Sequence, residues 1–260
     1  MSGIDSRAVI SPSARIGTGV CIGPFAVVGD EVELGDGCVL APHAVVKGPS
    51  TFGRDNQIHS FAIVGGDPQD LTYTGQRVRL EVGDANEFRE FSTVHRGTIK
   101  GGGVTRIGSH CLIMAYAHIG HDCMIGDHVI LTNGAQLAGH IIVEDHAGIS
   151  SFCLLHQFSR IGRHSYVGAG TIITQDVPPF SMVVGPRETR CYGINKVGLE
   201  RSGFSAERIQ TLEKAYRYLL RSKLNTSQAI EKMRGTLAHS EDVQTLIRFI
   251  ESTNERGLTK

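Results

Sequence analysis

The sequence has a six-residue period of apolar residues, and this period limits the possible folds more than any other feature. Stepping by six from Ile10 to Val64 meets an apolar residue at all ten positions. With an apolar fraction of 40%, such a run arises by chance about once in ten thousand trials. The period returns from Val82 to Val94 and, after a one-residue shift, continues from Ile107 to Ile173.

A six-residue period fits a short strand followed by a turn, and it fits neither an α-helix nor a β-hairpin. Three such repeats close a triangular coil of 18 residues, and stacked coils pair strand on strand. The interior of such a narrow prism suits Val, Ile and Leu, in keeping with a chain that has no tryptophan. The repeats therefore predict a parallel β-helix of about eight coils.

Two segments break the period, and a third region has a different pattern. Residues 66–81 and 95–106 are polar and rich in turn formers, so we expect them to be loops that leave the prism, where loops often carry function. From Ser205 onward the apolar spacing becomes three and four, with Ser205, Thr226 and Ser240 as candidate N-caps. The predicted domains are a β-helix at 1–190 and an α-helical domain at 191–260.

Composition excludes several classes of protein. Lys+Arg and Asp+Glu are equal at 26 each, so no global field favours nucleic acid. The N-terminal segment has no apolar signal region, and no run reaches the length of a membrane span. The six cysteines form no C-x-x-C pair, so we expect reduced thiols in a cytoplasmic protein, without a structural zinc site.

Stacking arithmetic predicts one histidine-rich strip, because residues 18 apart occupy the same corner of adjacent coils. Two neighbouring columns result: His121, Gly139 and Gln157, beside Asp122, His140 and Phe158. The strip carries four histidines: His118, His121, His140 and His156. A neutral His next to a carboxylate is a competent general base for a hydroxyl group, and a glycine N–H can stabilise an oxyanion. The strip is suited to acid–base chemistry or to metal binding. If the reaction is acyl transfer, we expect direct transfer, because no serine or cysteine is obviously paired with a base, and we expect His121 to be the base with Asp122 as its partner.

The chain resembles the UDP-N-acetylglucosamine O-acyltransferases that begin lipid A synthesis. The segments that carry the resemblance are QDL (69–71), HRGT (95–98), HIGHDC (118–123), LAGH (137–140), HQF (156–158), QDVPP (175–179), GIN (193–195) and RSGFS (201–205). The resemblance implies a left-handed β-helix and a homotrimer with active sites between subunits. It also implies transfer of a 3-hydroxyacyl chain from acyl carrier protein to the sugar 3-hydroxyl, without a cofactor or a metal.

The resemblance also implies roles for individual residues. His121 would be the general base, Asp122 its partner and Gly139 the oxyanion donor. The residues implied around the nucleotide sugar are Asp70, His95, His118, His140, His156, Gln157, Asn195 and Arg201. Ala169 stands at the position that limits acyl length. Basic residues of the helical tail would face the carrier protein: Arg208, Lys214, Arg217, Arg221 and Lys223. Thr72 replaces a lysine that is usual in the family.

Three other readings of the strip stay open at this point. The acceptor could be a 3-amino sugar, which would give an amide instead of an ester. Histidines shared across a trimer interface could bind zinc, as in γ-class carbonic anhydrases. A β-helix could also be purely structural, although it would then need no histidine strip.

Overall fold

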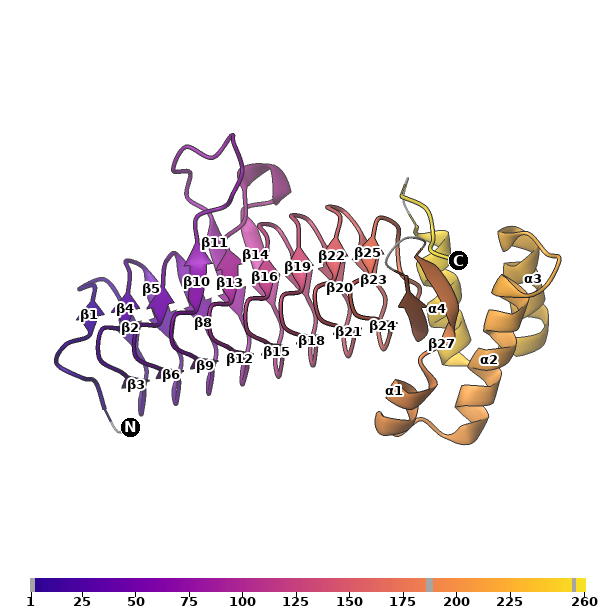
Figure 1. Ribbon diagram of the computed structural model, residues 1–260, viewed down its shortest axis with the longest axis horizontal. Helices are drawn as coiled ribbons and strands as arrows, with labels where there is room; N and C mark the ends of the chain where they lie inside the picture. Colours follow the sequence, from indigo (N-terminus) through magenta and orange to yellow (C-terminus); the bar gives the residue numbers. More distant parts are fainter. Residues whose placement is uncertain (1–2, 186–188, 254–255) are drawn as a thin grey trace.

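The computed structural model describes residues 3–185, 189–253 and 256–260. Its strands form a prism with three parallel sheets, and helices cover one end of the prism (Figure 1). Up to β25, each strand pairs with the strand three places earlier or later in the chain, as in the register His118↔Gln136 and Ile119↔Leu137 between β16 and β19, whereas β24 also pairs with β26 at the end of the prism. This is the 18-residue coil that the period predicts. The predicted fold, a left-handed parallel β-helix followed by helices, is confirmed.

We call the three faces the first, second and third sheets. The first contains β1 (Val9–Ile10), β4 (Val27–Val28), β7 (Val45–Val46), β10 (Ile63–Gly66), β13 (Thr93–His95), β16 (His118–Ile119), β19 (Gln136–Leu137), β22 (Leu154–Leu155) and β25 (Ile172–Ile173). The second contains β2 (Arg15–Ile16), β5 (Val32–Leu34), β8 (Ser50–Phe52), β11 (Arg79–Val82), β14 (Val104–Ile107), β17 (Met124–Ile125), β20 (Ile142–Val143) and β23 (Arg160–Ile161).

The third sheet contains β3 (Cys21–Ile22), β6 (Val39–Leu40), β9 (Gln57–Ile58), β12 (Glu87–Phe88), β15 (Leu112–Ile113), β18 (Ile130–Leu131), β21 (Gly148–Ile149), β24 (Tyr166–Val167), β26 (Ser181–Val184) and β27 (Arg190–Ile194). The chain passes from the first sheet to the second, then to the third, and back to the first. We call the turns between them the first corner (first to second sheet), the second corner (second to third) and the third corner (third to first).

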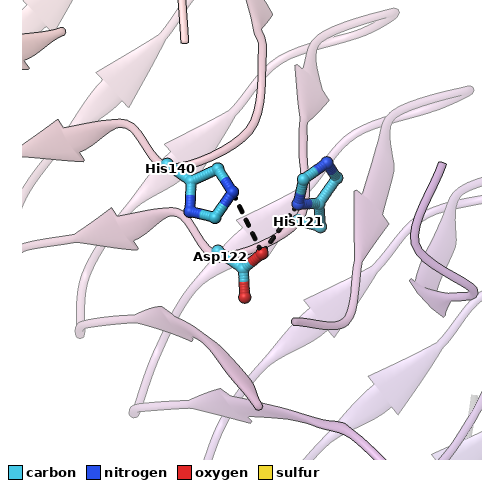
Figure 2. Close-up of side chains that lie close together, drawn as sticks. All are labelled: His121, Asp122 and His140. Atoms are coloured by element: carbon cyan, nitrogen blue, oxygen red, sulfur yellow. Dashed lines mark hydrogen bonds and ion pairs between the residues drawn. The ribbon is translucent and has the colours of Figure 1, made fainter. Parts of the chain in front are cut away.

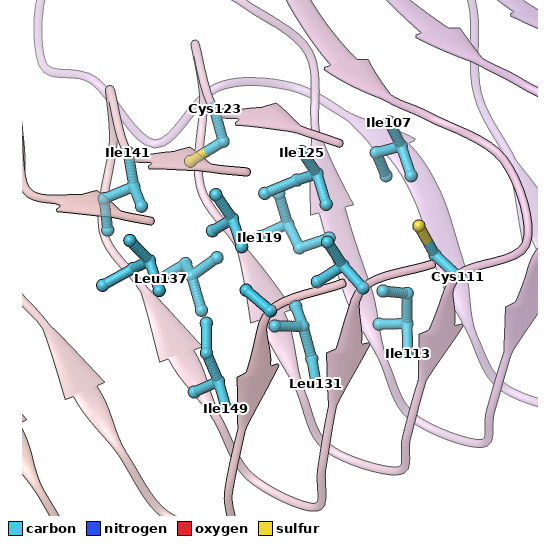
Figure 3. Close-up of a cluster of buried hydrophobic side chains, with 14 of the residues drawn as sticks. Ile107, Cys111, Ile113, Ile119, Cys123, Ile125, Leu131, Leu137, Ile141 and Ile149 are labelled. Atoms are coloured by element: carbon cyan, nitrogen blue, oxygen red, sulfur yellow. The ribbon is translucent and has the colours of Figure 1, made fainter. Parts of the chain in front are cut away.

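The periodic aliphatic residues fill the prism. Ile119, Leu131 and Leu137 are fully buried and stack with their neighbours along the axis (Figure 3). Most turns bend the chain through one left-handed residue, such as Asp122 at φ 62° and His140 at φ 61°. Asp and His enter this region more readily than most residues, but Phe is as frequent as His among the non-glycine residues that occupy it here.

Both predicted loops leave the prism at the first corner, where Figure 1 shows them side by side. They are shorter than predicted, because residues 79–81 belong to β11 and residues 104–106 to β14. These strands look like loop segments in the sequence because their outward residues are charged. Arg79 and Arg106 both form ion pairs with Glu81. The second loop contains the 3₁₀ helix η1 (Ile99–Gly101).

The C-terminal segment contains α1 (Lys196–Arg201), α2 (Ala206–Leu220), α3 (Thr226–Leu237) and α4 (Glu241–Glu251). Ser205 and Ser240 cap helices as predicted, whereas α3 is capped by Asn225 instead of Thr226. Asn225 forms a capping box with Gln228, which satisfies two backbone N–H groups at once.

The end of the prism is joined to the helices by hydrogen bonds. Strand β27 pairs antiparallel with β26 and lies across the predicted boundary at residue 190, so the domain division stays a prediction. The hydroxyl of Tyr216 on α2 donates to the carbonyl of Pro179. Among the described residues, no helix is both long and apolar enough to cross a bilayer.

Candidate active site

His121 and Asp122 form a hydrogen-bonded pair at the first corner. The Nδ1 atom of His121 lies 2.7 Å from Oδ2 of Asp122 (Figure 2). The carboxylate is almost completely buried, with 1% of the side chain exposed, while the imidazole is 14% exposed. An N–H on Nδ1 that donates to Asp122 leaves the lone pair of Nε2 available. No hydrogen bond joins this Nε2 to another described residue.

The second loop fixes the Asp122 carboxylate. The backbone N–H of Thr98 donates to Oδ1 at 2.6 Å, and its hydroxyl donates to Oδ2 at 2.7 Å. The backbone N–H of Asp122 donates to the hydroxyl of Thr105 at 2.8 Å. Gly101 covers the carboxylate so closely that a Cβ there would lie 2.0 Å from Cγ of Asp122. Asp122 is therefore held in one orientation by Thr98 and Gly101 of the second loop and by Thr105 of β14.

Gly139 lies one coil along from His121, as the stacking arithmetic predicts. A Cβ on Gly139 would lie 2.6 Å from Cε1 and 2.8 Å from Nε2 of His121, so a larger residue would displace the imidazole. The carbonyl of Gly139 accepts from the N–H of Phe158. Its own N–H has no hydrogen-bond partner among the described residues, so this donor is available next to the His121 ring.

His140 completes the cluster from the neighbouring column. Its ring stands edge-on to His121, with centroids 5.2 Å apart, and stacks on Phe158 at 4.5 Å. Its Nε2 lies 3.6 Å from Oδ2 of Asp122 (Figure 2). Burial lowers the pKa of His140 despite the nearby carboxylate, which favours a neutral imidazole at physiological pH.

His118 and His95 extend the cluster along the first sheet. The Nδ1 of His118 lies 2.8 Å from the Thr93 hydroxyl, and the ring of His95 stands edge-on to it at 4.9 Å. Burial, together with the neighbouring His118 and His121, lowers the pKa of His95 to about 4. Burial also lowers the pKa of His118. Both rings are therefore neutral hydrogen-bonding groups at neutral pH.

Asp70 lies in the first loop, and Thr72 uses part of its carboxylate. The N–H and the hydroxyl of Thr72 both donate to Oδ1 of Asp70, at 2.6 Å each, and lower the pKa of that carboxyl. The other oxygen, Oδ2, receives no hydrogen bond from the described part of the chain. The buried Arg96 of the second loop ties the two loops together. It donates to Gly65, Gly48, Asp67 and Tyr73.

His156 and Gln157 lie at the first corner in the next coil, and both are exposed. The Nδ1–H of His156 donates to the carbonyl of Gln157 at 3.1 Å. The predicted strip is thus one continuous surface. It contains His118, His121, Asp122, Gly139, His140, His156 and Gln157. His95 extends it along the first sheet, and Asp70 of the first loop lies opposite.

Three predicted residues lie elsewhere on the chain. Asn195 caps α1 and donates to the carbonyl of His164 at the second corner, and Arg201 is the exposed last residue of the same helix. Ala169 is exposed at the third corner, between β24 and β25. The prism separates these corners from His121. A single chain therefore does not assemble the whole predicted set.

Sequence reasoning missed the residues that position the pair. Thr93, Thr98 and Thr105 donate to or accept from the histidine–aspartate cluster, and Gly101 packs on it. Thr98 belongs to the HRGT segment, which is the signal that could have identified it. The contact with Asp122 could not be derived from the 18-residue arithmetic, because loop residues have no place in the coil register. Among the described residues, His121, Asp122 and His140 are also the one group whose ligand atoms are close enough to share a metal ion.

The three-sheet coil of six-residue repeats places the chain in the class of hexapeptide-repeat proteins. A model described as bacterial transferase hexapeptide (six repeats) matches residues 13–48 and 105–139. A second, described as UDP-N-acetylglucosamine O-acyltransferase, domain 2, matches residues 176–259.

Full-length relatives narrow this class to one family. The acyl-[acyl-carrier-protein]–UDP-N-acetylglucosamine O-acyltransferases of Halorhodospira halophila and Stutzerimonas stutzeri are 47% and 48% identical, over 100% of both chains in each comparison. The solved structure from Acinetobacter baumannii is 40% identical with a TM-score of 0.95, over 99% of both chains. The Francisella novicida enzyme is 36% identical with a TM-score of 0.95, over 99% of this chain and 94% of that one. The chain belongs to the UDP-N-acetylglucosamine O-acyltransferase family.

Proposed function

We propose that this protein transfers a 3-hydroxyacyl chain from acyl carrier protein to the 3-hydroxyl of UDP-N-acetylglucosamine, the first step of lipid A synthesis. The observation that carries the proposal is the 2.7 Å contact between His121 and the buried Asp122, which leaves Nε2 of His121 available at the surface. The names of the full-length relatives support the same donor and acceptor.

The reaction begins with proton removal from the sugar hydroxyl. His121 Nε2 accepts this proton as the hydroxyl oxygen attacks the thioester carbonyl carbon of the donor. Asp122 accepts the Nδ1–H hydrogen bond, so it orients the ring and stabilises the imidazolium that forms. Thr98 keeps the carboxylate in place while this charge develops.

The tetrahedral intermediate then collapses. Its oxyanion accepts a hydrogen bond from the N–H of Gly139, which is the free donor beside the ring. The carbon–sulfur bond breaks, and the imidazolium returns the proton to the leaving thiolate of the carrier's prosthetic arm. The products are a sugar ester and a carrier thiol, and the base is regenerated.

We propose that the working form is a homotrimer. Exposed apolar side chains gather at the third corner and on the two sheets that meet there. At the corner these are Phe25, Phe61, Phe91, Tyr116 and Phe152; on the first sheet Ile63, Leu154 and Ile172; and on the third sheet Ile130, Tyr166 and Met182. The second sheet carries ion pairs instead, such as Arg15 with Glu33. Contiguous apolar surface of this kind is typical of an interface.

This pattern fits a closed ring in which the first sheet of each chain faces the third sheet of the next. Such a ring brings the second corner of the neighbouring chain toward His121. Asn195 and Arg201 of the neighbouring chain would then reach the nucleotide sugar. Ala169 of the neighbouring chain would reach the acyl chain. This explains why one chain distributes the predicted residues over three corners.

Helix α2 offers a basic surface for the acidic carrier protein. Arg217 and Arg221 line a cleft of about 420 Å³ with Tyr192 and Tyr216, at the junction with β27. Arg208 contributes less, because it makes a two-point ion pair with Asp242. We infer that Lys214, Arg217, Arg221 and Lys223 supply most of the attraction to the carrier.

The direct test combines the purified chain, 3-hydroxyacyl carrier proteins of several lengths, and UDP-N-acetylglucosamine. We expect a product heavier by one hydroxyacyl group, which mild alkali cleaves because it is an ester. A product that resists alkali, formed from a 3-amino sugar, would support the amide reaction instead. Absence of any acylated sugar with all donors would contradict the proposal. The preferred donor length would test the role of Ala169.

A further inference from the structure

The cluster of Figure 2 has ligands for a metal ion as well as groups for acid–base chemistry. His121, Asp122 and His140 each offer one ligand atom, a ring nitrogen or a carboxylate oxygen, and these three atoms lie within 4.8 Å of one another. Two imidazole nitrogens and one carboxylate oxygen are a common ligand set for Zn²⁺, with bonds of about 2.0–2.2 Å. Water would fill the remaining positions, because His140 is 21% exposed.

We propose that these three residues form an inhibitory site for Zn²⁺ and related transition-metal ions. The distances from Oδ2 of Asp122 to the nitrogens of His121 and His140 are 2.7 and 3.6 Å. Ligand atoms around a tetrahedral ion with such bonds lie about 3.3 Å apart. Small rotations of the side chains would therefore admit the ion, and the backbone would not need to move.

The side chains that would bind the ion are already held in fixed orientations, as a metal site requires. Thr98 fixes the carboxylate of Asp122 through two hydrogen bonds, and Phe158 stacks on His140. Partners of this kind orient ligands and raise metal affinity. The ion would enter from the surface strip, where both imidazoles are partly exposed.

Metal binding would prevent His121 from accepting the sugar proton. This consequence rests on the function proposed above. A neutral imidazole has one N–H and one lone pair. In the catalytic form, the proton is on Nδ1 of His121 and the lone pair is on Nε2. An ion bound to Nδ1 takes a lone pair there, so the proton moves to Nε2 through solvent. Nε2 then has no lone pair to accept the sugar proton, and no net proton is gained or lost.

The test measures metal binding without reference to turnover. The full-length chain, freed of metal by a chelator, is dialysed against Zn²⁺, and against Co²⁺ as a visible probe. We expect one ion per chain and a cobalt spectrum of nitrogen and oxygen ligands. His140→Gln should weaken binding at least about tenfold, because it removes a ligand. His110→Gln is the matched control, since it removes an exposed histidine whose only ring partner in the described chain is His128.

Three results would overturn the proposal. The first is a wild-type chain that retains no ion, and the second is a His140→Gln chain that retains the ion as tightly as wild type. The third is a cobalt spectrum of thiolate ligands, which would place the metal at one of the six free cysteines. Circular dichroism of the variants checks that the fold is intact.

Turnover separates this proposal from the proposed function. Zn²⁺ should abolish acyl transfer by the wild type, and excess chelator should restore it. A metal-free chain that binds Zn²⁺ but transfers no acyl group would contradict the function and support the metal site. A chain that transfers acyl groups but binds no Zn²⁺ would contradict the metal site alone.

Discussion

Thr98 donates two hydrogen bonds to the carboxylate of Asp122, one from its backbone N–H at 2.6 Å and one from its hydroxyl at 2.7 Å. Thr98 lies in the second loop and Asp122 at a corner of the prism. The contact therefore joins a loop outside the repeat to the residue that orients the proposed base. It explains why a loop that interrupts the coil is placed at this corner.

Replacing Thr98 by Val should lower kcat about 10- to 100-fold with little change in KM for the sugar nucleotide. The variant keeps the backbone donor but loses the hydroxyl, so Asp122 holds the His121 ring less firmly. Thr98→Ser restores the hydroxyl and should recover most of the rate. Steady-state kinetics of the two variants provide the check, and equal rates for Val and Ser would show that the hydroxyl has no such role.

Gly139→Ala should reduce acyl transfer at least about 100-fold while the fold is retained. The added methyl group would lie 2.6 Å from the His121 ring and would push the imidazole away from the acceptor hydroxyl. Gly235→Ala is the matched control, because a Cβ there meets no atom within 4 Å and the position lies in α3. That control should stabilise the chain by about 0.5–1 kcal/mol. Activity assays with thermal unfolding of both variants test this, and an active Gly139→Ala enzyme would contradict the geometry.

Leu154→Glu should break the trimer and abolish acyl transfer. Leu154 is 48% exposed on the first sheet, where we propose that the neighbouring chain packs, and a buried, unpaired charge is costly. Ile142→Glu is the control, because Ile142 is 41% exposed on the charged second sheet. Sedimentation equilibrium should give three chains for wild type and Ile142→Glu. A trimeric Leu154→Glu protein, or a monomeric wild type, would disprove the proposed interface.

The chain should lose stability as the pH falls from about 6.5 toward 4. Burial lowers the pKa of His164 to about 4, helped by the stacked His146. The unfolded chain, with the ordinary pKa near 6.5, therefore binds more protons than the folded chain in this range, and its population rises on acidification. Above pH 6.5 the His164 imidazole is neutral in both the folded and the unfolded chain, so its effect on stability vanishes.

His164→Phe should make this acid destabilisation smaller. Phenylalanine occupies equivalent left-handed corner positions at Phe158 and Phe180, so the ring should be accommodated. Melting temperatures at pH 7.5 and pH 5 measure the difference for both proteins. An identical drop in the variant and the wild type would rule out His164 as a contributor.

The repeat was predictable because each inward position obeys one rule. Ile119 and Leu137 had to be apolar and 18 residues apart, and the same arithmetic placed His121 beside Gly139. Strands β11 and β14 broke the rule on the outside, where Arg79, Glu81 and Arg106 neutralise one another, and β14 also broke it inside, where buried Thr105 lies next to Leu80. Their charges were therefore read as loop residues.

The rest of the site could not be derived from the period. The Thr98–Asp122 contact depends on how a loop folds back, which no coil register specifies. Asn195 caps α1 and Arg201 ends that helix, and both would reach the site only across the proposed trimer interface. The roles of Asn195 and Arg201 came from the family resemblance alone, whereas that of Gly139 was also inferred from the stacking arithmetic. All three roles stay predictions until they are measured.

The most direct test of the account is the rate of acyl transfer to UDP-N-acetylglucosamine by His121→Ala, compared with His110→Ala, at saturating carrier protein. General-base catalysis contributes about 10²- to 10⁴-fold. We therefore predict a loss of at least about 100-fold for His121→Ala and a near wild-type rate for His110→Ala. An undiminished rate in His121→Ala would contradict the assignment of the base and with it the proposed mechanism.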